Sequence, residues 1–132
     1  MKVASESLAA SMKLIHGDDA MLIARNTVPG HWGCTERIFD GPVNSSVATG
    51  LVSAAPPQYQ WSTFSDSNTL LEEAFSREAG WRFLDVFSPT VLRSDAHIGG
   101  KDCLHYCLPG PADHWIVLLY NTLLAAANVR QE

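Results

Sequence analysis

A five-residue apolar run, Ala20 to Ala24, is the feature that most constrains how this chain can fold. Continuous apolar runs of this length beside turn residues are typical of a strand buried on both faces of a parallel sheet. Before it, residues 3–15 place apolar side chains at helical spacing, and Gly17-Asp18-Asp19 follows where a helix would end. A helix, a tight turn and a buried strand are the parts of an α/β layered domain.

The same alternation returns in the second half of the chain. Residues 65–68 offer N-cap side chains for a helix predicted over 68–79, and Gly80 would end it. Residues 81–87 then predict a second strand, which Ser88-Pro89 closes. Between the two units, residues 25–65 show few regular signals. The part from 40 to 58 is either a functional loop or a poorly ordered insertion.

The last apolar segment predicts a helix that begins at Pro111, a position where the first helical turn tolerates proline. Asp113 lies in the favoured acidic position of that turn. Apolar side chains recur at helical spacing along the segment, and we interpret this stripe as core packing. Its members are Trp115, Leu118, Leu119, Thr122, Leu123 and Ala126.

Charge and length exclude some classes of partner. The net charge is −5 and the nine basic residues are scattered, which disfavours nucleic acid because phosphate backbones require clustered Lys and Arg. No apolar run approaches the roughly 20 residues that span a bilayer, and the first residues do not form a signal peptide. Three cysteines are an odd number for an exported protein, so we expect that the beginning of the chain is missing.

The segment from Asp102 to His114 is the densest in reactive side chains. Asp102 and His105 are three apart, and in a single helical turn their side chains would lie on the same face. The carboxylate could then orient the imidazole and stabilise its protonated form, as in the acid and base of a nucleophilic site. The structural alternative is a capping Asp beside a half-buried His.

A metal site is a second alternative. Its candidate ligands are Asp95, His97, Asp102, His105 and His114. Their spacing matches no compact zinc pattern, so we assign no metal ligands. Cys103 and Cys107 are four apart and do not form a C-x-x-C redox pair, which favours structural disulfides.

The run D-C-L-H-Y-C-L-P-G from Asp102 to Gly110, followed by Asp113-x-Trp115, resembles the terminal signature of the trichome birefringence-like and PC-esterase families. Tyr106 stands where the family has Trp. Residues 93–97 resemble the family's R-x-D-A-H element, and residues 25–34 resemble its R-T-x-x-P-x-H segment. These families are SGNH/GDSL-type acyl esterases and polysaccharide O-acetyltransferases.

The resemblance implies a fold and a set of roles. Residues 1–132 would be the C-terminal portion of one three-layer α/β/α domain with a mostly parallel sheet. Asp102 and His105 would be the acid and base of a Ser-His-Asp triad. Four residues would shape the site or meet substrate: Arg25, His31, Asp95 and His97. Cys34 would pair with Cys103, and Cys107 with a cysteine upstream.

The implied partners are a glycan acceptor and an acetyl donor, without a cofactor, in the secretory pathway and specifically the Golgi lumen. The chain departs from the family in one respect, because it contains no Gly-Asp-Ser nucleophile motif. The nearest string, Gly17-Asp18-Asp19, follows a helix and lacks the hydroxyl. We therefore expect the isolated chain to be inactive. The alternative is a non-catalytic remnant or glycan-binding module of the same fold.

Overall fold

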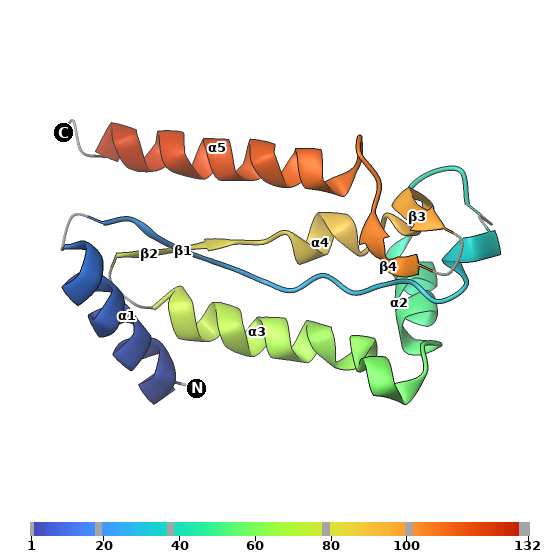
Figure 1. The fold of residues 1–132 in the computed structure, drawn as a ribbon, viewed down its shortest axis with the longest axis horizontal. Helices are drawn as coiled ribbons and strands as arrows, with labels where there is room; N and C mark the ends of the chain where they lie inside the picture. The colour runs from blue at the N-terminus through green and yellow to red at the C-terminus, as the bar shows by residue number, and fades with distance from the viewer. Residues whose placement is uncertain (1, 18–19, 37–38, 78–79, 100–101, 130–132) are drawn as a thin grey trace.

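The computed structural model describes residues 2–17, 20–36, 39–77, 80–99 and 102–129 (Figure 1). The helices are α1 (Lys2–His16), α2 (Ser45–Ser53), α3 (Phe64–Phe75), α4 (Phe87–Thr90) and α5 (Pro111–Val129). The strands are β1 (Leu22–Arg25), β2 (Trp81–Leu84), β3 (His97–Gly99) and β4 (Asp102–Tyr106). Short 3₁₀ turns lie at Cys34–Glu36, Pro57–Tyr59, Trp61–Thr63 and Ser94–Ala96.

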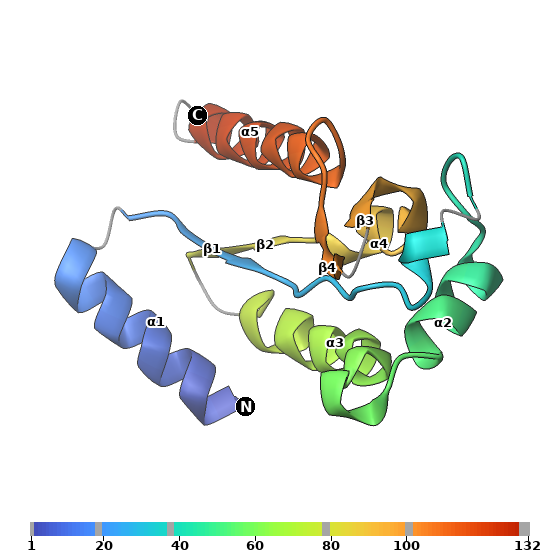
Figure 2. The ribbon, with the colours of Figure 1, turned by 45° about the vertical axis from the view of Figure 1, so that its right-hand side comes forward.

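Two small sheets organise these elements. β1 and β2 pair in parallel from Leu22 opposite Trp81 to Arg25 opposite Leu84, whereas β3 and β4 form an antiparallel hairpin. Helix α5 lies on one side of the β1–β2 pair, and α1 and α3 lie on the other (Figures 1 and 2). The α/β class is therefore correct. Among the described residues the parallel sheet has only two strands, so the expected larger sheet is not seen here.

The core lies where α3 packs against this sheet. Leu22, Phe75 and Trp81 are buried together, with the rings of Phe75 and Trp81 centred 4.5 Å apart. The predicted strand at 20–24 is present as β1, but it is not buried on both faces. Only Leu22 is buried, and Arg25 is exposed, because too few elements surround a two-stranded sheet to cover both of its faces.

Element boundaries differ from the sequence prediction in several places, including β1, which spans Leu22–Arg25 and not residues 20–24. The helix predicted over 68–79 spans 64–75, and its N-cap residue, Thr63, makes no side-chain capping bond. The strand predicted over 81–87 ends at Leu84, and α4 begins at Phe87. Gly17 ends α1 as predicted, with a positive φ of 85°. Asp18 and Asp19 of the predicted turn lie outside the described residues.

Residues 40–58 contain a helix that the sequence did not predict. The side chain of Asn44 accepts a hydrogen bond from the N–H of Val47 and caps the N-terminus of α2. Ala48 and Val52 are buried on its inner face, at 1% and 7% exposure. A nine-residue helix with only two buried positions carries too little periodicity to be recognised. Residues 45–53 of this segment are thus an ordered helix and not part of a poorly ordered insertion, and the alternative of a functional segment stays a prediction.

Helix α5 begins at Pro111 as predicted, and the Asp113 carboxylate accepts a hydrogen bond from the N–H of Gly110. The prediction that its stripe is core packing was only partly right. Trp115 and Leu118 are partly buried, but Leu119 and Leu123 are 37% and 41% exposed. One narrow edge of α5 meets the sheet, so most of its apolar surface has no covering element here. No helix in the described part of the chain is long and apolar enough to cross a membrane.

Two buried amide side chains hold the segment after β1 in place. The Oδ1 of Asn26 accepts hydrogen bonds from the N–H groups of Val86 and Phe87, both at 2.8 Å. Asn68 donates to the carbonyl of Thr27 and accepts from its N–H, as a neighbouring strand would. The predicted N-cap role of Asn68 is therefore wrong, because its amide is used to satisfy another segment's backbone.

We expect Asn26→Ala to lower the free energy of unfolding by about 2 kcal/mol or more, because it leaves two main-chain N–H groups without an acceptor. Urea denaturation followed by circular dichroism measures the change. Asn121→Ala, at an exposed position on α5, is the matched control and should change stability by less than about 0.5 kcal/mol. Equal stability of the two variants would contradict the assigned role of Asn26.

Candidate active site

The β3–β4 hairpin carries Asp102 and His105 at the end of the molecule where α2 and α4 meet it (Figure 1). The prediction that they share a helical turn was wrong, because both lie in β4. Residues three apart in a regular strand point to opposite faces. Here the Oδ1 of Asp102 accepts hydrogen bonds from the N–H groups of Leu104 and His105, at 3.0 and 2.9 Å. This local turn brings the two side chains together.

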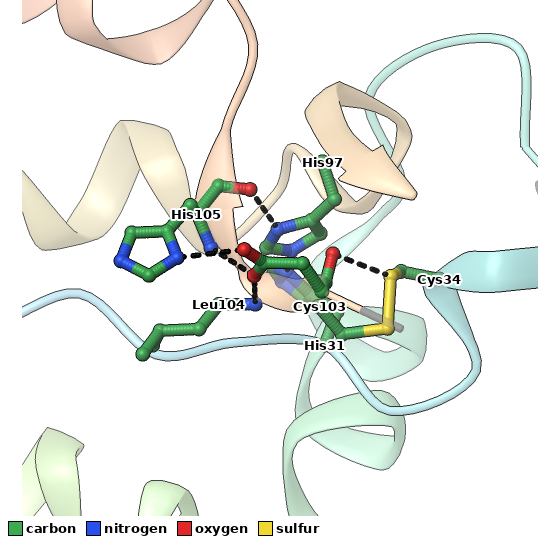
Figure 3. The surroundings of a disulfide bond; sticks show 7 residues. His31, Cys34, His97, Cys103, Leu104 and His105 are labelled. Carbon is green, nitrogen blue, oxygen red and sulfur yellow. Dashed lines mark hydrogen bonds and ion pairs between the residues drawn. A yellow bond between two sulfur atoms is a disulfide. The ribbon is translucent and has the colours of Figure 1, made fainter. Parts of the chain in front are cut away.

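The second carboxylate oxygen of Asp102 lies 2.8 Å from the Nδ1 of His105 (Figure 3). Hydrogen bonds from the main-chain N–H of His105, from its ring and from the N–H of Leu104 lower the pKa of Asp102 to about 2. The ionised carboxylate therefore holds the proton of neutral His105 on Nδ1 and leaves Nε2 as the basic nitrogen. The His105 side chain is 68% exposed, and no described hydroxyl group hydrogen-bonds to its Nε2.

Residues 26–34 form the support beneath β4. A disulfide joins Cys34 to Cys103, across 69 positions of sequence, and is the pairing that the family resemblance implies. The main-chain N–H of His31 also donates to the carbonyl of Cys103 at 3.0 Å. Closing a loop of this length stabilises a fold by about 4 kcal/mol in the chain-entropy model. Asp102 and His105 therefore sit on either side of a residue that is fixed covalently.

Two buried histidines lie under the hairpin. His31 and His97 are 0% and 3% exposed, and the Nδ1 of His31 is 2.8 Å from the Nε2 of His97. The other nitrogen of His97 meets the carbonyl of His105 at 3.0 Å (Figure 3). The other nitrogen of His31 meets the carbonyl of Val91 at 2.7 Å. As placed, neither ring reaches the surface, and both act on the site through the backbone of His105.

The number of ring protons limits which protonation states the His31–His97 pair can adopt. Carbonyl oxygens only accept, so both outer contacts require an N–H, and two neutral rings then have no proton left for the contact between them. A third proton would complete that hydrogen bond but would bury a charge, which costs several kcal/mol. The cost of desolvating that charge is the larger effect, because burial lowers the pKa of His97 to about 4 and also lowers the pKa of His31.

Tyr106 connects the hairpin to the same support. Its hydroxyl donates to the carbonyl of Pro29 at 2.6 Å, and its ring stacks on His97 with centroids 4.3 Å apart. Burial raises the pKa of the Tyr106 phenol, so it remains a donor. The Trp of the family signature would lack this hydroxyl. Its ring N–H would have to donate to the carbonyl of Pro29 from a different position.

The remaining predicted site residues are dispersed. Arg25 is exposed, with its guanidinium 5.8 Å from the ring centre of Trp115. Asp95 forms an ion pair with Arg93 at 2.8 Å, and that hydrogen bond is the main cause of its lowered pKa. Cys107 has no disulfide partner among the described residues. In the described part of the chain, no three His, Cys, Asp or Glu side chains are grouped to hold a metal ion.

Two open hollows border His105. One, of about 390 Å³, lies between Asp102–His105 and three aromatic side chains, Trp32, Tyr59 and Trp61. The other, of about 350 Å³, is lined by Arg25, Thr27 and Trp115 among others. An oriented histidine with access from two sides can take a proton from one bound group and deliver it to another.

The model of one protein family matches residues 53–122, which include the whole β3–β4 hairpin. This family is PC-esterase, described as the GDSL/SGNH-like acyl-esterase family found in Pmr5 and Cas1p. The chain belongs to the PC-esterase family. Asp102 and His105 lie within the matched residues of this PC-esterase chain, whereas His31 and Cys34 lie outside them.

Curated relatives agree with this assignment. Protein trichome birefringence-like 39 of Arabidopsis thaliana is 41% identical over 33% of this chain and 14% of its own length. Xylan O-acetyltransferase 7 of Oryza sativa subsp. japonica is 35% identical, over 39% of this chain and 12% of its own length. Xyloglucan O-acetyltransferase 1 of Arabidopsis thaliana is also 35% identical, over 38% and 16% respectively. The matches thus span about a seventh of each relative's length. No solved structure matches the chain significantly.

Sequence reasoning missed several residues that build this site. Asn26 and the hydroxyl of Tyr106 were assigned no role, and Asn68 was assigned the wrong one, although each satisfies a backbone group that the site depends on. Single polar side chains do not repeat at helical or strand spacing, so the sequence pattern could not reveal these contacts. The signal available for the aromatic hollow was the presence of Trp32, Tyr59 and Trp61 in one turn-rich stretch.

The buried histidine pair makes stability depend on pH. The pKa of His97 is near 4, below the 6.5 of an unfolded histidine, so as the pH falls the unfolded chain takes up protons first. We expect the free energy of unfolding to be undiminished above pH 6.5 and to decrease between about pH 6.5 and 4. Urea titrations across this range measure it, and the C2–H resonance of His97 should titrate with a midpoint near pH 4.

His97→Gln should flatten this dependence, and His114→Gln, at an exposed position on α5, should not. If His97→Gln does not fold, the NMR titration of the unmodified chain still decides the matter. A His97 midpoint at or above pH 6.5 would contradict the effect of burial.

Proposed function

We propose that this chain supplies the acid and base of an acyl-ester site that acts on glycan hydroxyls, as a polysaccharide O-acetyltransferase or acetylesterase. The observation that carries the proposal is the 2.8 Å contact between the Asp102 carboxylate and the Nδ1 of His105, with Nε2 left exposed. A general base requires this arrangement: an ionised carboxylate hydrogen-bonds to one ring nitrogen, and the second ring nitrogen is free to take a proton. Membership of the PC-esterase family supports the choice of acyl-ester chemistry.

The reaction would proceed in two halves. In the first, the Nε2 of His105 takes the proton of a serine hydroxyl while the serine oxygen attacks the acetyl ester, and the departing alcohol receives that proton. In the second, a sugar hydroxyl or water gives its proton to Nε2 and attacks the acyl-serine; the bond from the acyl carbon to the serine oxygen breaks, and Nε2 returns the proton to that oxygen. Asp102 stabilises the protonated imidazole in both halves. The serine would come from outside these 132 residues, because they contain no Gly-Asp-Ser motif.

The glycan and the compartment are supported by different observations. Two relatives are named for O-acetyl transfer to xylan and xyloglucan, which favours a neutral cell-wall polysaccharide as acceptor. The Cys34–Cys103 disulfide favours an oxidising compartment of the secretory pathway, such as the Golgi lumen.

The exposed apolar surface supports the proposal that these residues are one portion of a larger three-layer domain. Six large apolar side chains of α5 are exposed: Ile116, Val117, Leu119, Tyr120, Leu123 and Leu124. Apolar surface of this extent on one helix is normally covered by another element. Further parallel strands beside the β1–β2 pair would cover it and would complete the fold class that the family resemblance implies.

A non-catalytic glycan-binding module is the second candidate. It is favoured by the lack of any described hydroxyl group in contact with the Nε2 of His105. Such a module would bind glycans without turnover. The two candidates therefore differ in whether acetyl-ester chemistry depends on His105.

We expect the 132-residue chain alone to show no His105-dependent hydrolysis of an activated acetyl ester, because the nucleophile and its oxyanion donors are absent. In the longest product that its transcript encodes, we expect turnover that falls about 10³-fold or more in His105→Ala and 10²-fold or more in Asp102→Asn. His114→Ala is the exposed histidine control and should retain full activity. Turnover unaffected by His105→Ala would refute the catalytic proposal.

A further inference from the structure

The hollow beside His105 has an aromatic side that the proposed acyl chemistry does not use. The ring of Tyr59 stacks on that of Trp61, with centroids 4.9 Å apart, and Trp32 lies 6.3 Å from Tyr59. Trp61 is 6% exposed and forms the support, whereas Trp32 and Tyr59 are 44% and 46% exposed. Asp102, Leu104 and His105 line the opposite side of the same hollow.

The backbone is built to hold these rings in position. Gln60, between Tyr59 and Trp61, has a φ of 55°, a left-handed conformation that is uncommon for residues other than glycine. That turn lets the side chains on either side of it stack. Such a conformation is strained and persists only where its surroundings enforce it.

Gly30 ties the aromatic side to the strand that carries His105. A Cβ at Gly30 would collide with both the ring of Trp61 and the carbonyl of Cys103. Only glycine therefore allows Trp61 to pack directly against β4. The main-chain N–H of Trp32 is also fixed, by a hydrogen bond to the carbonyl of Leu51 on α2. Packing and this hydrogen bond therefore fix the position of the aromatic rings relative to His105.

The charge of the residues that line the hollow limits which ligands it can bind. Among the residues that the structure describes, its lining contains no Lys or Arg, and the Asp102 carboxylate is strongly ionised. Together with the net charge of −5, this disfavours phosphates, nucleotides and acidic sugars. Aromatic faces carry negative charge and attract the weakly positive C–H groups of a flat, neutral ring, whose hydroxyls can meet the polar rim. A neutral pyranose has this combination of surfaces.

We propose that Trp32 and Tyr59 form a stacking subsite that holds a neutral sugar ring of the acceptor polysaccharide beside His105. The inference rests on the proposed function, because it assigns the acceptor to this hollow and leaves the Arg25 side for the acyl donor. Stacking orients the sugar ring without discriminating strongly between linkages, so Trp32 and Tyr59 are positioning residues.

The test is binding of xylohexaose to the purified chain, measured by isothermal titration calorimetry and by NMR shift mapping. Tyr59→Ala and Trp32→Ala should each weaken binding about tenfold (about 1.4 kcal/mol), because each removes an aromatic face on which the sugar ring would stack. Tyr59→Phe keeps the ring and should bind as the unmodified chain does. Tyr120→Ala removes an exposed tyrosine on α5 and is the matched control. An acidic galacturonic acid hexamer should bind more weakly than xylohexaose.

The outcomes separate this inference from the proposed function. His105→Ala should abolish acetyl-ester turnover in the longer product. Loss of turnover in His105→Ala, combined with unchanged affinity in both Trp32→Ala and Tyr59→Ala, would overturn the subsite and leave the catalytic role intact. Tighter binding of the acidic hexamer, or no binding of xylohexaose by the unmodified chain, would also overturn it.

Discussion

The site depends on how the segment from Asn26 to Cys34 satisfies its backbone without a strand partner. A buried main-chain N–H or C=O must find a hydrogen bond, and this segment leaves β1 before the sheet can provide one. The Asn68 amide pairs with Thr27, the hydroxyl of Tyr106 with the carbonyl of Pro29, and the carbonyl of Cys103 with the N–H of His31. Two of these partners lie on β4. The same bonds that bury the segment therefore hold the strand of Asp102 and His105.

Burial divides the polar residues of this region into two electrostatic groups. At the surface, three hydrogen bonds keep Asp102 ionised, with its pKa lowered to about 2, and give His105 a defined tautomer. Beneath it, His31 and His97 are almost free of solvent, and burial opposes their protonation. The ring available for proton transfer is thus the exposed one. The buried pair serves as a rigid, uncharged support for the backbone of His105.

The two hollows that border His105 differ in chemical character. One side is aromatic, with no Lys or Arg among the described residues that line it, and the other includes Arg25. A base that faces chemically different spaces can serve two groups in turn, which is what acyl transfer between two alcohols requires. The disulfide and the close packing at Gly30 fix the base relative to the aromatic side. The geometry on the Arg25 side depends on an exposed side chain and is less constrained.

The sequence by itself determined the α/β class and the start of α5 at Pro111, because these follow from local patterns. Through a long motif it also singled out Asp102 and His105 as candidate site residues. It misjudged α2, the burial of β1 and the stripe of α5, since burial depends on which elements surround a segment. Only the tertiary structure could show that Asp102 and His105 meet through a turn in a strand, because that geometry comes from side-chain bonds to the backbone. Only it could bring Trp32, Tyr59 and Trp61 beside His105, because contacts between distant segments leave no trace in residue spacing.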